Sequence, residues 1–444
     1  MRALVLVDGE HYPSTTRWGL ATARALGFEV VACLLAGGIE KLGADRALNL
    51  GDLPVEVSEG SLREAVSAAI GRHRPEVVLD LSDEPVLGYR ERMEVAAVVL
   101  AAGLRFVGPD FVLDPPVRGA ALPVPTLAVI GTGKRSGKTA VAGEAARVAN
   151  GNGLRPVVVA MGRGGPPGPQ VVEAGTATVN HLLALVEAGE HAASDYLEDA
   201  VTTGVTTVGA RRVGGGLAGR PFATNVREAA EAAAALGPGL VVLEGSGAAV
   251  PPVPWDAGVL VCQATLPQEY LGGYLGPYRV LLSDLVVFTM SRGPQGGPRD
   301  LSDLISHVRR LRPEARIAVT DLRPVCLGEV KERKVFFTTT APEAALPELV
   351  ASLEASSGCA VVGASHRLGD RAGLDADLRA ASAFDVLATE LKAGAVDVAA
   401  VRARERGAEI VFVDNRPETL DGDGDVGDLL LETARMAVDR AKQR

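Results

Sequence analysis

Residues 131–139 read Gly131-Thr-Gly-Lys-Arg-Ser-Gly-Lys138-Thr139, and this stretch decides the fold of the chain. An apolar run, 127–130, precedes it, and a helix-forming run, 140–149, follows it. A strand, a glycine-rich turn and a helix in this order are the context of a phosphate-binding loop. Glycines let successive backbone N–H groups point at phosphate oxygens, and the helix N-terminus adds partial positive charge. The stretch therefore predicts a nucleotide-binding site.

Each side chain of the loop has an expected part in binding a nucleotide. We expect Lys138 to reach the β- and γ-phosphates of ATP and the Thr139 hydroxyl to bind Mg²⁺. Because phosphoryl transfer depends on charge neutralisation, we expect Lys134 and Arg135 to act as catalytic cations beside Lys138. A solvent-facing charge is the alternative for Lys134. The residues expected to bind the nucleotide are Gly131, Thr132, Gly133, Ser136, Gly137, Lys138 and Thr139.

The spacing of the loop departs from the strict pattern G-x-x-x-x-G-K-[ST], because five residues separate Gly131 from Gly137. It resembles the G-T-x-x-x-x-G-K-T loop of dethiobiotin synthetase and its relatives, which use ATP to activate a small-molecule oxyanion. The run 240–247 is also similar to that group, since an apolar strand there ends in Glu244. An acidic residue at this place holds Mg²⁺, so we expect Glu244 to bind metal and to take part in catalysis. Asp321, after a later strand, is the candidate for contact with adenine.

The composition limits the class of protein. With 444 residues and 47% hydrophobic residues, two or three domains with ample cores are expected. A net charge of -10 argues against nucleic acid or an anionic membrane as a partner, so an anionic substrate needs a local basic cluster. The four cysteines form no C-x-x-C pair, which favours buried thiols in a reducing cytoplasm. Apolar runs are too short for a signal peptide or a bilayer span, so we expect a cytoplasmic protein.

The pattern of strand-like and helix-like runs divides the chain. Residues 1–122 alternate the two, which is typical of βαβ units on a parallel sheet. The proline-rich segment 114–125 is expected to be a linker. We therefore expect an α/β protein with a Rossmann-like parallel-sheet domain at 1–122. A P-loop NTPase domain of the dethiobiotin synthetase type is expected at 123–355, and a small α/β subdomain at 356–444.

Charged residues gather where the predicted strands of the N-terminal domain end, which is the edge where open parallel sheets bind ligands. The substrate-binding candidates at this edge are Asp8, Glu10, His11, Lys41, Arg90 and Arg92. For His11, phosphate binding, an acid role and the capping of a turn all remain open. Two glycine-rich stretches, 161–169 and 211–220, carry arginines that predict anion binding, with plain connecting loops as the alternative. Their candidates are Arg163, Arg211, Arg212 and Arg220.

An acidic run near the C-terminus, Asp421-Gly-Asp-Gly-Asp425, resembles the start of a calcium loop. Val426 stands at the sixth position, where an EF-hand requires glycine. We therefore expect this run to be a solvated loop.

Three motifs taken together resemble the cyclic 2,3-diphosphoglycerate synthetase family. They are D-G-E-H-Y-P at 8–13, G-T-G-K-R-S-G-K-T at 131–139 and M-G-R-G-G-P at 161–166, and the resemblance covers the whole chain. It implies an ATP- and Mg²⁺-dependent closure of 2,3-diphosphoglycerate to its cyclic phosphoanhydride, with ADP and phosphate released. Phosphorylation of one substrate phosphate would allow the other to attack within the same molecule. We also expect a homodimer.

Two other functions remain alternatives. One is an ATP-dependent amidoligase or a dethiobiotin-type synthetase, which would favour a carboxylate or amine acceptor and a less basic site. The other is a P-loop nucleotide switch or metallochaperone without a small substrate. Such proteins usually carry Cys/His metal ligands, whereas this chain has no such pattern and has an additional N-terminal domain.

Overall fold

The computed structural model describes residues 1–444 except 39–41, 43–47, 59, 118 and 294–296. Within these residues the strands form two sheets, of six and thirteen strands. Both sheets are mostly parallel, with helices between successive strands. The chain is therefore an α/β protein, as the sequence predicts. No helix in the described part is long and apolar enough to cross a membrane.

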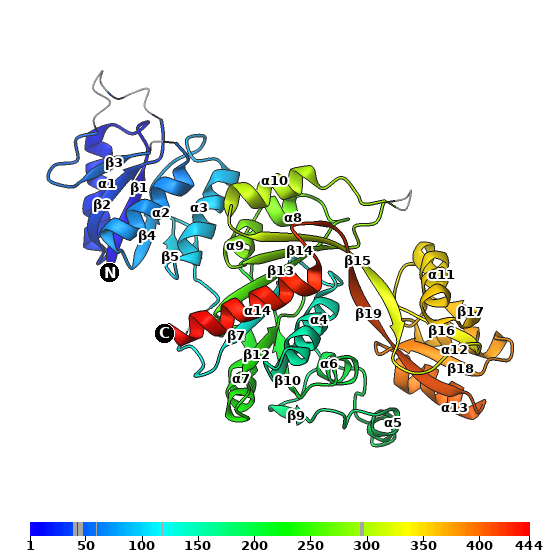
Figure 1. Cartoon of the computed structure of the whole chain (residues 1–444). Coiled ribbons are helices and arrows are strands. Elements are labelled where there is room, and N and C mark those ends of the chain that lie inside the picture. Colours follow the sequence, from blue (N-terminus) through cyan, green and yellow to red (C-terminus); the bar gives the residue numbers. More distant parts are fainter. Residues whose placement is uncertain (39–41, 43–47, 59, 118, 294–296) are drawn as a thin grey trace.

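The six-stranded sheet is built from the first part of the chain, blue to cyan in Figure 1. Its strand order is β3-β2-β1-β4-β5-β6, and only the β5–β6 pair is antiparallel. The central strand is a continuous buried apolar run, because helices cover both faces of such a sheet. The elements are β1 Arg2–Val7, α1 Pro13–Ala25, β2 Glu29–Leu35, β3 Val55–Val57, α2 Leu62–His73, β4 Val77–Asp80, α3 Tyr89–Ala101, β5 Arg105–Val107 and β6 Val112–Leu113.

The middle of the chain forms one half of the large sheet, with strand order β11-β10-β8-β12-β7-β13-β14-β15. The strand before the glycine-rich loop, β7, lies between β12 and β13, so the loop opens at the centre of the sheet's carboxyl edge. The elements up to β12 are β7 Thr126–Gly131, α4 Lys138–Gly151, β8 Pro156–Gly162, β9 Gln170–Val172, α5 Val179–Glu187, α6 Asp195–Thr203, β10 Thr207–Val213, β11 Ala223–Thr224, α7 Val226–Ala235 and β12 Leu240–Glu244. The remaining ones are β13 Ala257–Gln263, α8 Glu269–Gly272, α9 Gly276–Leu281, β14 Leu285–Thr289, α10 Ser302–Leu311 and β15 Arg316–Cys326.

A long antiparallel ribbon of β15 and β19 carries the sheet onward to the strands β18-β16-β17 (Figure 1). These last strands and β19 are mutually parallel. The elements are β16 Lys334–Thr338, the 3-10 helix η2 Glu343–Ala345, α11 Leu346–Ser357, β17 Ala360–Ser365, α12 Arg371–Ala380, β18 Val386–Glu390, the π-helix η3 Ala395–Ala400, α13 Val401–Glu405, β19 Glu409–Gly422 and α14 Val426–Lys442. The acidic run 421–425 is exposed throughout, and residues 423–425 form the turn between β19 and α14, as expected of a solvated loop. Its carboxylates also make contacts, because Asp423 accepts hydrogen bonds from Arg309 and from Ile317 N, and Asp425 caps α14.

The predicted domain limits 1–122, 123–355 and 356–444 remain predictions. Two observations bear on the last one. Strand β16 pairs with β17 and β18, which favours counting residues from 334 with the C-terminal strands. Helix α14 instead returns to the P-loop part and packs beside α4 in its core, as the red helix of Figure 1 shows.

The N-terminal part packs against the P-loop part through helices. Helix α3 contacts α9, whose Tyr278 is almost fully buried in a cluster with the core of the six-stranded sheet. An ion pair between Arg310 and Glu94, at 2.6 Å, joins α10 to α3. Tyr89, at the start of α3, lies beside Tyr274 in the loop after α8, and the centroids of the two rings are 6.4 Å apart.

Candidate active site

The glycine-rich loop folds back over the side chain of its own lysine. Lys138 Nζ donates hydrogen bonds to Gly133 O at 2.7 Å and to Ser136 Oγ at 3.1 Å. A Cβ at Gly131 would lie 2.8 Å from Lys138 Cδ, so only glycine fits there. Burial lowers the pKa of Lys138 to about 8, although the Glu244 carboxylate opposes this effect. A buried cation with only neutral acceptors is prepared to bind an anionic phosphate.

Glu244 lies beside Thr139, at the point where the loop joins α4. Thr139 Oγ1 donates a hydrogen bond of 2.7 Å to Glu244 Oε1. Glu244 ends β12 and is buried, and apart from Thr139 its carboxyl group faces the carboxyl group of Asp199. Burial, with the nearby charge of Asp195, raises the pKa of Glu244 to about 7. Thr289 holds the loop from behind, because its hydroxyl donates to Ser136 O at 2.7 Å.

Helix α6 adds two carboxyl groups that the sequence did not single out as site residues. Asp199 is fully buried, and it lies close enough to Glu244 for the two carboxyl groups to share a hydrogen bond when one of them is protonated. Burial, and then the charge of Glu244, raises the pKa of Asp199 well above its usual value. Asp195 lies four residues earlier, beside Gly162, where an added Cβ would be 3.2 Å from Asp195 Oδ2. The spacing of four residues, which places both carboxyls on one face of a helix, was the available signal.

Two of the predicted arginines converge next to Glu244. A Cβ at Gly247 would lie 2.9 Å from Arg163 Nη2 and 3.1 Å from Arg212 Nη2. Arg212 Nη2 also donates to Ser246 O at 2.8 Å. Burial, and then the charge of Arg163, lowers the pKa of Arg212. Two guanidinium groups held this close repel each other, so an anion between them would be bound strongly.

The other two arginines lie elsewhere. Arg211 Nε donates to Pro166 O at 2.8 Å, so its side chain is turned toward the loop after β8. Arg220 lies 3.7 Å from Asp114 of the N-terminal part, with its side chain 60% exposed. The structure therefore brings Arg163 and Arg212 to the P-loop, while a substrate role for Arg211 and Arg220 remains a prediction.

The N-terminal candidates form a cluster of ion pairs at the carboxyl edge of their own sheet. Asp8 is buried and accepts from His11 Nδ1 at 2.7 Å. Arg92 pairs with Asp80 at 2.8 Å and with Glu84 at 3.1 Å. The backbone N–H of Glu10 also donates to Asp8. Arg90 is exposed at the start of α3. Lys41 lies outside the described residues. Acidic partners thus occupy His11 and Arg92, and the substrate role of the cluster stays a prediction.

The remaining candidates lie around the mouth of the loop. Lys134 and Arg135 are exposed, and Arg135 has a φ of 61°. Asp321 Oδ2 accepts from Arg292 Nε at 3.0 Å, so the expected adenine contact is engaged in an ion pair on β15. The roles of these three residues stay predictions.

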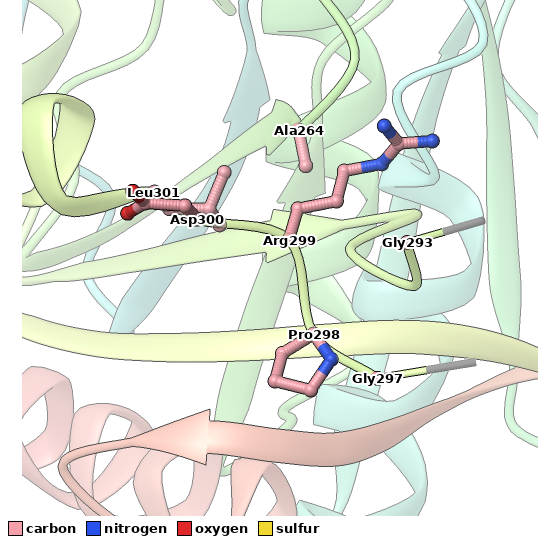
Figure 2. A pocket seen from close by; sticks show the side chains of 7 residues that line it. All are labelled: Ala264, Gly293, Gly297, Pro298, Arg299, Asp300 and Leu301. Carbon is pink, nitrogen blue, oxygen red and sulfur yellow. The ribbon is translucent and has the colours of Figure 1, made fainter. Parts of the chain in front are cut away.

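A cavity of about 450 Å³ lies at the same sheet edge. Its lining comes from the residue after β13 and from the loop after β14, and Figure 2 shows the Arg299 side chain extending away from Asp300 and Leu301. The complete lining is Ala264, Gly293, Gly297, Pro298, Arg299, Asp300 and Leu301. Strand β13 is a direct neighbour of β7, so the cavity is on the nucleotide side of the sheet.

The residues present fit a divalent cation at Thr139 and Glu244. Two buried carboxyl groups, those of Glu244 and Asp199, lie within hydrogen-bonding reach of each other at this place, so a cation bound there would replace the proton that they can share. No three His, Cys, Asp or Glu side chains converge on a preformed metal centre in the described part of the chain. Magnesium usually takes only one or two carboxylates and completes its shell with phosphate and water.

A buried loop lysine, a threonine at the helix start and a glutamate at the end of the neighbouring strand define a P-loop nucleotide-binding enzyme. Models of three domains of the cyclic 2,3-diphosphoglycerate synthetase match the chain: the N-terminal domain at residues 2–114, the P-loop domain at 126–321 and the C-terminal domain at 326–416. The chain belongs to the cyclic 2,3-diphosphoglycerate synthetase family. It is an ATP-binding ligase, and the family, enzyme class and activity predicted from the sequence are confirmed at the level of the family.

Similar proteins cover nearly the whole chain. The cyclic 2,3-diphosphoglycerate synthetase of Rubrobacter xylanophilus is 47% identical over 442 residues, which are 98% of each chain. That of Methanothermobacter thermautotrophicus is 39% identical over 450 residues, 98% of this chain and 96% of the other. Among solved structures, LpxK from Aquifex aeolicus in complex with ATP has a TM-score of 0.41 and 12% identity, covering 78% of this chain and 96% of that one. At that level the similarity supports no argument about the site.

Proposed function

We propose that the chain closes 2,3-diphosphoglycerate to its cyclic phosphoanhydride in an ATP- and Mg²⁺-dependent reaction at the P-loop, with release of ADP and phosphate. The observation that carries this proposal is that two anion-binding sites lie next to each other, one for the nucleotide and one for the acceptor phosphate. Lys138 and Thr139 form the nucleotide side, and Arg163 and Arg212 meet next to Glu244. A γ-phosphoryl group and a phosphorylated acceptor would therefore lie side by side.

A substrate phosphate has no good leaving group, so it must be activated before the second phosphate can attack it. In the first step the γ-phosphoryl group leaves ADP and forms a bond to an oxygen of one substrate phosphate. In the second step an oxygen of the other substrate phosphate attacks the phosphorus of the activated one. The bond between that phosphorus and the oxygen that joins it to the transferred group breaks. The transferred group keeps this oxygen, leaves as inorganic phosphate and takes up a proton from solvent. Both steps transfer a phosphoryl group, so charge neutralisation is the main demand on the protein.

The protein residues divide this demand between them. Lys138 would exchange its bonds to Gly133 O and Ser136 Oγ for β- and γ-phosphate oxygens. Arg163 and Arg212 would hold the acceptor phosphate between their guanidinium groups, a geometry that favours oxyanions. Lys134 and Arg135, exposed at the loop mouth, are proposed as further catalytic cations.

Mg²⁺ would be held by Thr139 and Glu244, and when bound it would screen the negative charge of the phosphates. The Thr139–Glu244 hydrogen bond already places both oxygens together. Asp199 lies behind Glu244 and would orient its carboxylate once a cation attracts both groups.

The finer description of the fold also belongs to the proposal. We propose a Rossmann-like N-terminal domain, supported by the strand order β3-β2-β1-β4-β5, and a P-loop domain of the dethiobiotin synthetase type. The C-terminal α/β subdomain, the homodimer and the cytoplasmic location also remain part of the proposal. Light scattering of the purified protein measures the oligomeric state directly.

The order of bond formation can be tested with oxygen isotopes. Purified protein is mixed with ATP, Mg²⁺ and 2,3-diphosphoglycerate that carries ¹⁸O in its phosphate groups, and the products are followed by ³¹P NMR. We expect cyclic product, ADP and phosphate in equal amounts, with one ¹⁸O atom from the substrate in each phosphate released.

Two controls give the experiment its meaning. Without 2,3-diphosphoglycerate, release of phosphate should fall to a low background. With unlabelled substrate in H₂¹⁸O, the released phosphate should contain no oxygen from water. Phosphate that carries water oxygen, or ADP formed without cyclic product, would overturn the proposed reaction.

A further inference from the structure

The C-terminal part of the chain reaches the carboxyl groups of the P-loop site through one lysine. Lys392 follows β18, and its Nζ lies 3.3 Å from Glu198 Oε1 on α6. About 35% of the Lys392 side chain is exposed, whereas Glu198 is 13% exposed. Lys392 is therefore paired with a carboxylate at its ammonium group, while part of its side chain still reaches solvent.

The turn that presents Lys392 is firmly anchored. Glu390, at the end of β18, is buried and accepts hydrogen bonds from Thr339 Oγ1 and from Asn415 Nδ2. Ala393 adopts a φ of 46°, a conformation that costs energy in residues other than glycine. Strain of this kind persists only where the surrounding structure holds it, so the position of Lys392 is set before any ligand binds.

The charge of Lys392 acts on the same carboxylate as the cations of the P-loop site. Burial raises the pKa of the Asp195 carboxyl group. Four positive charges lower it and so oppose this rise, namely those of Lys392, Lys138, Arg163 and Arg212. The geometry agrees, because Asp195 lies three residues before Glu198 on α6 and beside Gly162, the residue that precedes Arg163. Burial alone would lower the pKa of Lys392, but the carboxylates of Glu198 and Glu390 outweigh it and raise that pKa.

We propose that Lys392 is a further substrate-binding residue, which the C-terminal domain contributes to bind a phosphate of 2,3-diphosphoglycerate together with Arg163 and Arg212. This inference rests on the proposed function, since it names the group that this substrate contacts. The substrate carries two phosphates and a carboxylate, while the nucleotide engages Lys138. A third cation paired with α6, the helix that also borders Arg163 through Asp195, would therefore meet a need that the P-loop domain leaves open.

Kinetic variants test the inference against a purely structural ion pair. Lys392→Met keeps most of the length of the side chain and removes the charge. We expect the KM for 2,3-diphosphoglycerate to rise about tenfold or more, as for loss of one charge-assisted hydrogen bond, with the KM for ATP within about twofold of wild type. Lys392→Arg should restore most of the loss.

The matched control is Arg404→Met. Arg404 pairs with Glu187 at 3.2 Å, and this pair also links the C-terminal domain to the P-loop domain, but both side chains are largely exposed. Its loss should leave both KM values unchanged. Equal effects of Lys392→Met and Arg404→Met, or a parallel rise of both KM values, would overturn the inference.

A double variant, Lys392→Met with Glu198→Gln, removes both charges of the ion pair, and the carboxylate of Glu390 keeps its hydrogen bonds from Thr339, Thr340 and Asn415. It decides the question even if the single variant fails to fold. A KM for 2,3-diphosphoglycerate as high as in the single variant, or about tenfold above wild type, supports the inference. A wild-type value would show that Lys392 serves only to neutralise Glu198.

Calorimetric titration of 2,3-diphosphoglycerate without ATP separates this inference from the proposed function. If wild type binds the compound and Lys392→Met binds it about tenfold more weakly, the inference holds even without cyclisation. If wild type forms the cyclic product and the variant binds as tightly as wild type, the inference fails while the function stands.

Discussion

The Thr139 hydroxyl donates a hydrogen bond of 2.7 Å to Glu244 Oε1, although 105 positions separate the two residues along the chain. The bond joins the start of α4 to the end of β12, the two elements that face a bound nucleotide. Removal of the charge at Glu244 should therefore affect the metal and not the fold, because glutamine retains the volume and an oxygen that accepts from Thr139.

Glu244→Gln should raise the Mg²⁺ concentration needed for half-maximal activity about tenfold or more, as expected when an oxygen ligand loses its charge. The thermal midpoint should change little. Activity is measured against Mg²⁺ at saturating ATP. The control is Glu231→Gln, whose side chain is exposed on α7 and which should leave the titration curve unchanged. A wild-type Mg²⁺ curve for Glu244→Gln would exclude Glu244 as a metal ligand.

Gly247→Ala should impair substrate use because the new Cβ would meet both Arg163 Nη2 and Arg212 Nη2. Gly247 has a φ of 60°, so the change also strains the backbone. Gly237→Ala is the matched control, since Gly237 has a φ of 67° and open space around it. Both variants should lose roughly 1 kcal/mol of stability. Only Gly247→Ala should raise the KM for 2,3-diphosphoglycerate, and equal kinetics of the two variants would contradict the role of the arginine pair.

Asp199→Asn should flatten the dependence of stability on pH. In the unfolded chain an aspartate ionises above a pH of about 4, whereas burial keeps Asp199 protonated to higher pH in the folded protein. The folded protein then binds more protons, so this contribution to stability is full below about pH 4 and is lost as the pH rises through the raised pKa. Asparagine cannot ionise, so the variant should lose that dependence.

Thermal midpoints between pH 5 and pH 8, without nucleotide and Mg²⁺, measure this effect. The midpoint of wild type should fall more steeply with rising pH than that of Asp199→Asn. The control is Asp439→Asn, whose carboxylate is exposed and pairs with Lys442. Identical slopes for wild type and Asp199→Asn would mean that Asp199 is ionised in the folded protein.

The N-terminal cluster should affect substrate use without affecting ATP. Arg90→Ala or His11→Ala should raise the KM for 2,3-diphosphoglycerate several-fold if this edge supplies part of the substrate site. Arg17→Ala on α1 is the control, because Arg17 is exposed and its side chain donates to Asn49 O and not to a residue of the cluster. Deletion of residues 1–122 is a poorer test, since it would expose Tyr278 and its neighbours to water. Unchanged kinetics in both variants would leave the substrate site to Arg163 and Arg212.

Local sequence patterns predicted the parts of the site that lie close together in the chain. The loop 131–139 and Glu244 could be recognised because a strand, a glycine-rich turn and a helix have their own spacing. Arg163 and Arg212 could be proposed from glycine-rich loops, but not distinguished from Arg211 and Arg220. Which arginine reaches the P-loop depends on the direction of each side chain from its strand, and that is set by tertiary packing.

Contacts between distant segments could not be predicted. Lys392 and Glu198 belong to different domains, and neither stands in a motif. The acidic run 421–425 is exposed, as its loop-like composition predicts. The hydrogen bond from Ile317 N to Asp423 could not be predicted, because the two residues meet only when β19 pairs with β15.

The ribbon of β15 and β19 has a mechanical consequence. Because its hydrogen bonds make the P-loop strands and the C-terminal strands a single sheet, the two parts cannot swing apart about a flexible joint. Leu322 of the ribbon also touches the loop, with its Cδ1 3.4 Å from a Cβ placed at Gly137. A movement of the C-terminal domain toward the loop would therefore have to bend or twist this ribbon, and its register is irregular between Val319 and Thr320, as at a β-bulge, where strands bend and twist more strongly.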